Sequence, residues 1–182
     1  LAPAISWQTG LAETLPFADS VFDRVVSQFG LMFFDEPTKA LREMRRVVKT
    51  DGRMVVAVWG PLESTPGYAA MVNLQRLFGT QVADALRAPF ALGDASLLRG
   101  MLADAGARKA TIETVDITAH FPSLEAWVQT DVKGWTLADM INDGQYQALL
   151  KAAREELGGF ELSDGTVAFN SPAHIATLGG PS

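Results

Sequence analysis

The pattern of apolar and polar positions is clearest between residues 22 and 59. Phe22–Phe29 is an apolar run rich in Phe and Val, which predicts a strand buried on both faces, as in a parallel sheet. Arg53–Trp59 is a second such run, and the turn signal Asp51-Gly52 precedes it. Between the runs, an N-cap carboxylate, a first-turn proline and an apolar stripe predict a helix: Asp35-Glu36-Pro37, then Leu41, Met44 and Val48. The segment is therefore expected to form a βαβ unit, with the charged side chains of its helix facing solvent.

The rest of the chain shows looser patterns. A short strand is expected at Ala4–Gln8, and Lys109–His120 alternates as one strand that Phe121-Pro122-Ser123 ends. Asp94 and Ser123 are predicted helix N-caps. The other expected elements are helices at Tyr68–Phe78, Asp94–Gly106, around Trp127 and at Tyr146–Leu157, and strands at Val167–Phe169 and Ala173–Leu178.

Composition and charge narrow the class of protein. With 182 residues, 48% hydrophobic and 20% charged, the chain is expected to be one globular domain. A net charge of −6 and the absence of a Lys/Arg cluster along the sequence argue against nucleic acid or an anionic membrane as partner. No apolar run approaches the ~20 residues that span a bilayer, and a cytoplasmic location is expected.

The side chains that could support chemistry are few. The sequence contains no cysteine, which excludes disulfides, thiolate catalysis and zinc sites of the Cys type. The two histidines, His120 and His174, lack metal-ligand spacing, and a structural role is expected for each. No metal site and no catalytic residue are identified from the sequence.

Two stretches carry a pattern at fixed spacing. They read Gly10-x-Ala12-Glu13-x-Leu15-Pro16-Phe17-x-Asp19-x-x-Phe22-Asp23-x-Val25 and Ala40-Leu41-x-Glu43-x-x-Arg46-Val47-x-Lys49-x-x-Gly52. In residue type and spacing they resemble the central segment of class I S-adenosylmethionine-dependent methyltransferases. The most similar group is the small-molecule type that includes the C-methyltransferases of ubiquinone and menaquinone biosynthesis.

The resemblance implies an α/β fold, a Rossmann-like sheet with helices on both faces. Residues 1–182 would be a single domain, the C-terminal two-thirds of that fold, with a helical lid inserted at about 121–160. The family's strand order is 3-2-1-4-5-7-6, with Phe22–Phe29 as the fourth strand and Ala4–Gln8 as the third. The family's N-terminal strands and glycine-rich turn have no counterpart in this sequence. The edge of Phe22–Phe29 is therefore expected to pair with a second copy of the chain or with a missing N-terminal segment.

The resemblance also implies S-adenosylmethionine as cofactor. Gly10, Leu11 and Ala12 would approach its adenine. The family often has Asp at the position of Leu11, so an apolar contact would replace a carboxylate acceptor here. The alternative for this segment is a polar loop with a buried leucine.

A second set of contacts is expected at the tip of the central strand. Ligands of open α/β sheets bind beyond the carboxyl ends of the strands. The backbone of Ser27, Gln28 and Phe29 lies at this position in the sequence, and in related enzymes this backbone contacts the cofactor.

Three tryptophans are candidates for the wall of an acceptor pocket. Trp59 ends a strand on the functional edge, and Trp127 and Trp135 belong to the expected lid. The alternative is ordinary core packing, because a tryptophan buries a large area wherever it lies. The acceptor is expected to be a small molecule, apolar or aromatic.

Two functions are carried forward. The first is methyl transfer from S-adenosylmethionine to that small molecule, which works mainly by aligning donor and acceptor in a dry site. The second is a non-catalytic remnant of the fold that acts as a binding or interaction domain.

Overall fold

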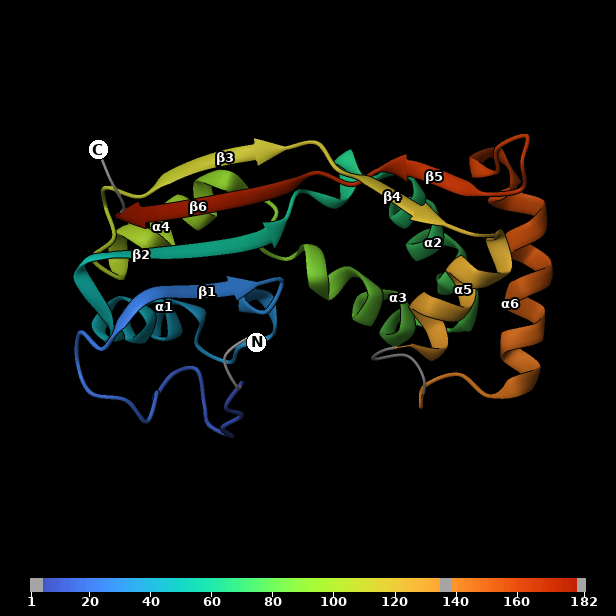
Figure 1. Cartoon of the computed structure of the whole chain (residues 1–182). Helices are drawn as coiled ribbons and strands as arrows, with labels where there is room; N and C mark the ends of the chain where they lie inside the picture. The colour runs from blue at the N-terminus through green and yellow to red at the C-terminus, as the bar shows by residue number, and fades with distance from the viewer. Residues whose placement is uncertain (1–4, 135–138, 180–182) are drawn as a thin grey trace.

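The computed structural model describes residues 5–134 and 139–179. A sheet-based body and a helical body lie side by side, and a long β-ribbon runs between them (Figure 1). The strands are β1 (Phe22–Gln28), β2 (Val48–Trp59), β3 (Thr111–Val115), β4 (Thr118–Phe121), β5 (Val167–Asn170) and β6 (Ala173–Gly179). The helices are α1 (Pro37–Val47), α2 (Pro66–Gln75), α3 (Thr80–Arg87), α4 (Ala95–Asp104), α5 (Leu124–Lys133) and α6 (Asp143–Glu156).

The larger sheet has the strand order β1-β2-β6-β3. β1 pairs parallel to β2, with Val25 opposite Met54, and the predicted βαβ unit is confirmed. β6 runs antiparallel to both β2 and β3. This order corresponds to strands 4-5-7-6 of the order expected from the resemblance, and it confirms the Rossmann-like α/β fold.

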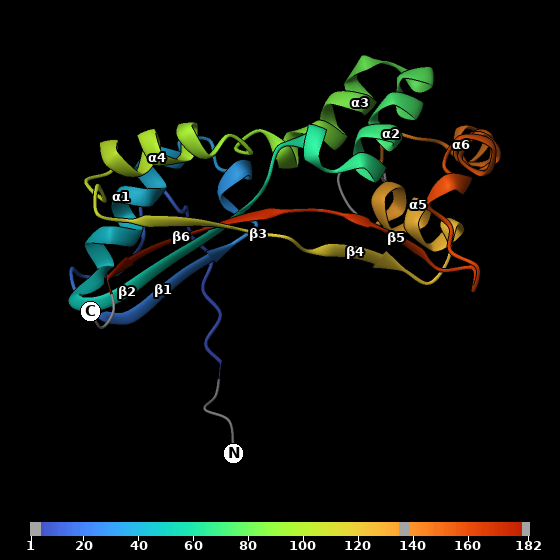
Figure 2. The same cartoon turned by 90° about the horizontal axis from the view of Figure 1, so that it is seen from above.

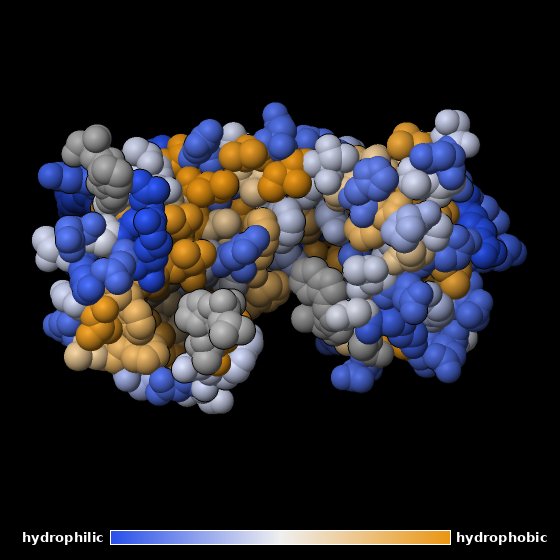
Figure 3. All heavy atoms as spheres, viewed as in Figure 1, coloured by the Kyte–Doolittle hydropathy of each residue, from blue (hydrophilic) through white to orange (hydrophobic). Residues whose placement is uncertain are grey.

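Both helices that cover this sheet lie on one face of it. Figure 2 shows α1 and α4 on the same side of the sheet, where Leu41, Leu98 and Val56 are fully buried together in its core. The expectation of helices on both faces is therefore not met in the described part of the chain. No helix of the described residues covers the opposite face, which shows many apolar side chains (Figure 3), and Val26 on β1 is 64% exposed.

β1 is an edge strand of the sheet, and two sequence-based predictions for this region are wrong. It is not buried on both faces, because no helix of the described residues covers its second face, and within the same residues a strand lies on one side of it only. Residues 5–8, predicted as a strand, adopt no regular structure, and Trp7 is 89% exposed. A strand needs a partner for its backbone hydrogen bonds, and no strand within residues 5–134 and 139–179 pairs with this segment.

The β-ribbon divides the predicted strand Lys109–His120 in two. β3 pairs with β6 in the main sheet, whereas β4 pairs with β5 beside the helical body. Between them Ser171 N–H donates to the Ile117 carbonyl over 2.7 Å, so the ribbon continues across the break. Alternation alone did not reveal this change of sheet.

The helical body has its own apolar core. α5 and α6 lie between β4 and β5, within the range 121–160 expected for the insertion. They pack with α2 and α3 around the fully buried residues Met71, Trp127 and Leu149. α2 packs closely against β5, since a Cβ at Gly67 of α2 would lie 2.4 Å from the ring of Phe169 on β5.

The helix termini follow the predicted chemistry with one exception. Asp94 caps α4 through Ser96 N–H, and Ser123 caps α5 through Ala126 N–H. At α1 the cap position is Glu36, which makes no capping bond and instead forms an ion pair with Lys39. None of the described helices is both long and apolar enough to cross a membrane.

Candidate functional site

An aromatic stack stands where β1 and β2 end. Phe29 follows the last residue of β1 and its N–H donates to the Ala57 carbonyl over 2.9 Å. Its ring lies against Trp59, the last residue of β2, with centroids 3.9 Å apart and planes 8° apart. Phe29 has φ +53°, a left-handed conformation that costs a bulky residue about 1–3 kcal/mol and is concentrated at functional sites. The tip Ser27–Phe29 is therefore held in a strained geometry at the carboxyl edge of the sheet.

The loop before β1 is clamped by two charged residues of α1. Glu43 Oε2 accepts from Leu15 N–H at 2.8 Å. Arg46 donates to the carbonyls of Leu15 and Phe17, to Asp19 and to both oxygens of Glu43. The hydrogen bonds from Arg46 hold the pKa of Glu43 below its usual range. Both side chains were predicted to face solvent, but they bind the chain that precedes the sheet.

In the loop held by this clamp, Gly10 and Leu11 are exposed. Leu11 is 70% exposed, so the alternative of a buried leucine is wrong. Ala12 packs against the core of the sheet. Glu13 accepts from Glu36 N–H at 3.3 Å, and Glu36 precedes α1 at the carboxyl side of β1. The two predicted cofactor segments, 10–12 and 27–29, thus lie toward the same end of β1.

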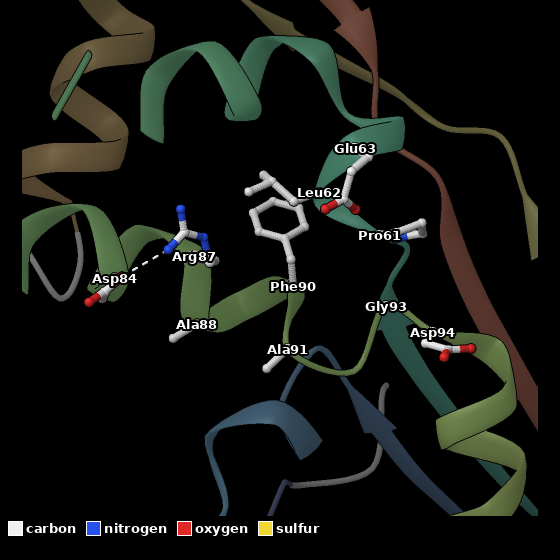
Figure 4. A pocket seen from close by; sticks show the side chains of 10 residues that line it. All are labelled: Pro61, Leu62, Glu63, Asp84, Arg87, Ala88, Phe90, Ala91, Gly93 and Asp94. Carbon is white, nitrogen blue, oxygen red and sulfur yellow. Dashed lines mark hydrogen bonds and ion pairs between the residues drawn. The ribbon is translucent and has the colours of Figure 1, made fainter. Parts of the chain in front are cut away.

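A cavity of about 430 Å³ lies beyond the end of β2. Phe90 stands between its walls, with Glu63 and Asp94 on one side and Arg87, paired to Asp84, on the other (Figure 4). Its volume is in the range of small-molecule sites.

The other side of Phe90 lines a second, apolar crevice. Trp59 and Tyr68 line it together with Leu86, Pro89 and Phe90, and its volume is about 20 Å³. Burial raises the pKa of the Tyr68 hydroxyl, so Tyr68 stays protonated. Of the three tryptophans that were candidates for a pocket wall, Trp59 lines this small crevice.

The structure places Trp127 in the core of the helical body instead of at a pocket wall. It is fully buried, stacks on Phe121 and donates from Nε1 to Asp131 at 2.7 Å. Asp131 is 2% exposed, and burial raises its pKa to about 7. Packing, the alternative weighed for Trp127, explains its position. The third candidate, Trp135, lies outside the described residues.

His174 has a structural position. It is buried on β6, where Nε2 donates to the Gly93 carbonyl at 2.8 Å and Nδ1 contacts the Thr114 hydroxyl at 2.8 Å. The carbonyl can only accept, so Nε2 carries the proton. Within the described ranges, no group of three or more His, Cys, Asp or Glu could hold a metal ion.

Sequence reasoning missed two sets of residues. Glu43 and Arg46 were part of the recognised pattern, and their i, i+3 spacing was the available signal. The crevice residues Tyr68 and Phe90 come from other elements than Trp59, Tyr68 from the helix that follows β2 and Phe90 from a segment about 30 residues later. No local signal marks them.

Known proteins resemble this chain in sequence over part of its length. Residues 1–56 match the family model described as a methyltransferase domain. Demethylmenaquinone methyltransferase of Renibacterium salmoninarum is 53% identical over 55 residues, which are 30% of this chain and 23% of that protein. Ubiquinone/menaquinone biosynthesis C-methyltransferase UbiE of Haemophilus ducreyi is 36% identical over 86 residues, 44% of this chain and 33% of that protein. The chain thus spans about a quarter to a third of the length of these curated relatives.

Solved structures extend the likeness of fold over nearly the whole chain. A candidate methyltransferase from Bacillus halodurans is 18% identical with a TM-score of 0.57, covering 98% of this chain and 78% of that one. The YcgJ protein of Bacillus subtilis is 20% identical with a TM-score of 0.56, covering 96% and 71%. The chain resembles class I S-adenosylmethionine-dependent methyltransferases, in sequence over its first third and in fold over its length. Nothing in these matches supports a non-catalytic remnant.

Proposed function

We propose that this chain, as a relative of the class I methyltransferases, takes part in methyl transfer from S-adenosylmethionine to a small apolar or aromatic acceptor. The observation that carries the proposal is the strained Phe29 stacked on Trp59 at the carboxyl ends of two adjacent parallel strands. Open α/β sheets bind their ligands at that edge. The loop that the Glu43–Arg46 pair holds carries the exposed side chain of Leu11, the apolar surface proposed to meet the cofactor.

The described residues fit one side of a cofactor site. Leu11 offers an exposed apolar surface for a flat base, and Ala12 a backbone amide. Gly30 follows the tip Ser27–Phe29, and a Cβ added at Gly30 would lie 3.4 Å from Ser27 Oγ. Bound S-adenosylmethionine supplies an electrophilic methyl group, and the role of this chain is to position it and to exclude water.

The acceptor would lie between the sheet and the helical body. Trp59 and Phe90 give that region apolar walls, and Glu63, Arg87 and Asp94 give the neighbouring cavity a polar rim. Because Asp131 is enclosed in the helical core, it is not proposed as a base.

Titration with S-adenosylhomocysteine tests this function. For the 182-residue chain we expect weak binding, with a Kd of roughly 1 mM or more, because the described residues form only one side of the proposed site. Calorimetry should give no micromolar isotherm, and amide NMR shifts should be confined to residues 10–12 and 27–30. Micromolar binding, or shifts centred elsewhere, would show that the site is misplaced.

Gly10→Val separates a ligand role of this glycine from a folding role. A Cβ at Gly10 would meet only the Pro16 ring, at 3.4 Å, so the Tm should hardly change while S-adenosylhomocysteine shifts at 10–12 disappear. Gly52→Ala is the opposite control, because its Cβ would lie 2.8 Å from the Asp23 carbonyl and should lower the Tm. Equal Tm losses for both variants would assign Gly10 to the turn.

Assembly is part of the proposal. The outer edge of β1 carries no neighbouring strand among the described residues, and such edges pair with other chains. We expect the chain to associate along β1, with a second copy or with a separate N-terminal segment. Sedimentation at low micromolar concentration should show dimers or larger species, and Val26→Lys should reduce them while Leu162→Lys, in the helical body, should not. A well-folded wild-type monomer would contradict this.

A further inference from the structure

A cleft of about 710 Å³ opens at the end of the sheet opposite the candidate methyl-transfer site. The amino ends of β1 and β2 and the carboxyl end of β6 meet there (Figure 1). The last turn of α1 and the segment between α4 and β3 complete its walls. Hydrophilic side chains gather at this end of the molecule (Figure 3).

Basic side chains dominate the lining. The cleft contains Arg45, Arg46, Lys49, Arg108 and Lys109, against one carboxylate, Asp19. This is unexpected in a chain whose net charge is −6. The five basic residues come from two segments about 60 residues apart, so the cluster cannot be recognised as a run of basic residues along the sequence.

Only part of this charge is neutralised within the molecule. Arg46 is engaged by Glu43 and Asp19, and Lys49 is paired with Asp23 at 2.7 Å. Asp51 is the other carboxylate near Lys49. Arg45, Arg108 and Lys109 make no hydrogen bond or ion pair with any residue that the structure describes.

The geometry brings the unpaired groups onto one surface. The Arg45 guanidinium lies over Gly106, where a Cβ would be 3.0 Å from Nη1, and Arg108 follows two residues later. Gly106 and Gly179, with φ of +81° and +76°, also line the cleft, and the Arg45 side chain and the Gly52 carbonyl occupy the space where their side chains would lie. The hydroxyls of Ser20 and Thr50 line the same cleft. Guanidinium, ammonium and hydroxyl groups bind phosphate oxygens.

Helix-end electrostatics explain only part of the cluster. Arg45 and Arg46 occupy the last turn of α1, where cations stabilise the helix dipole. Arg108 and Lys109 lie outside any helix, on the approach to β3, so that explanation does not reach them.

We propose that this cleft binds a phosphate-bearing ligand at a site separate from methyl transfer. S-adenosylmethionine has no phosphate, so the ligand is not the proposed cofactor. The shared chemistry is a phosphate group, which a free small molecule or a lipid headgroup can supply.

The test uses the Arg108→Glu/Lys109→Glu double variant of the whole chain. Arg99→Glu/Lys151→Glu is the matched control, because these residues are exposed, do not line the cleft and give the same change in net charge. Inorganic pyrophosphate is titrated by calorimetry, and sedimentation is measured with phosphatidylcholine vesicles with and without phosphatidylglycerol. Circular dichroism checks that both variants fold.

We expect saturable pyrophosphate binding that the double variant weakens by at least about tenfold and the control leaves unchanged. A lipid source of the phosphate would be supported if the chain sedimented only with the vesicles that contain phosphatidylglycerol and if the double variant, but not the control, lost this binding. Absence of both kinds of binding, or equal losses in the two variants, would overturn the proposal.

Discussion

Replacing Asp131 by asparagine is expected to stabilise the chain at pH 8 and to flatten its stability between about pH 4 and 7. Asp131 is 2% exposed, and burial raises its pKa from 3.8 to about 7. The folded state therefore holds a proton that the unfolded chain releases, so stability falls as pH rises through this interval. The shift corresponds to about 4 kcal/mol of cost for the ionised form at pH 8.

Asparagine removes this cost and keeps the packing. Its amide oxygen can accept from Trp127 Nε1–H as the carboxylate does at 2.7 Å. Chemical unfolding at pH 4, 6 and 8 measures the effect, and Asp143→Asn is the control because the Asp143 side chain is 99% exposed. If the Asp131 variant kept the wild-type pH dependence, the raised pKa would be wrong.

Replacing Arg46 by methionine is expected to release the loop at 10–19 and to abolish the proposed cofactor contacts at 10–12. The variant removes the donors to Leu15, Phe17 and Asp19 and leaves Glu43 without its cation. Glu43 then holds the loop only through Leu15 N–H. The wild-type clamp should weaken in acid as well. The pKa of Glu43 is lower in the folded chain than in the unfolded chain, so ionised Glu43 stabilises the fold at any pH above its unfolded pKa. This contribution is lost as the pH falls through the folded pKa.

Hydrogen exchange measures this release directly. The Leu15 amide should exchange much faster in Arg46→Met, and S-adenosylhomocysteine shifts at 10–12 should vanish while those at 27–30 persist. Arg42→Met is the matched control, since Arg42 lies on the same helix but binds the Asp104 carbonyl instead. Unchanged protection of Leu15 would mean that the loop holds its shape without the clamp.

Local patterns predicted much of the framework. The βαβ unit, the caps at Asp94 and Ser123, and the strands near 167 and 173 are properties of short segments. Hydrophobic periodicity and capping chemistry act over a few residues, so they can be read directly from the sequence. The positions of Gly10–Ala12 and Ser27–Phe29 near one end of β1 followed from the order of elements in the family that the chain resembles.

What the sequence by itself determined was the class of fold, the strand order and the segments that could meet a cofactor. Tertiary structure alone decided the burial of Trp127, the exposure of Val26 and the division of the strand Lys109–His120. It also decided that Glu43 and Arg46 hold a loop and that Arg45 and Arg108 share a cleft. Burial, edges and charge clusters depend on which distant segments pack together, and no local pattern contains that information.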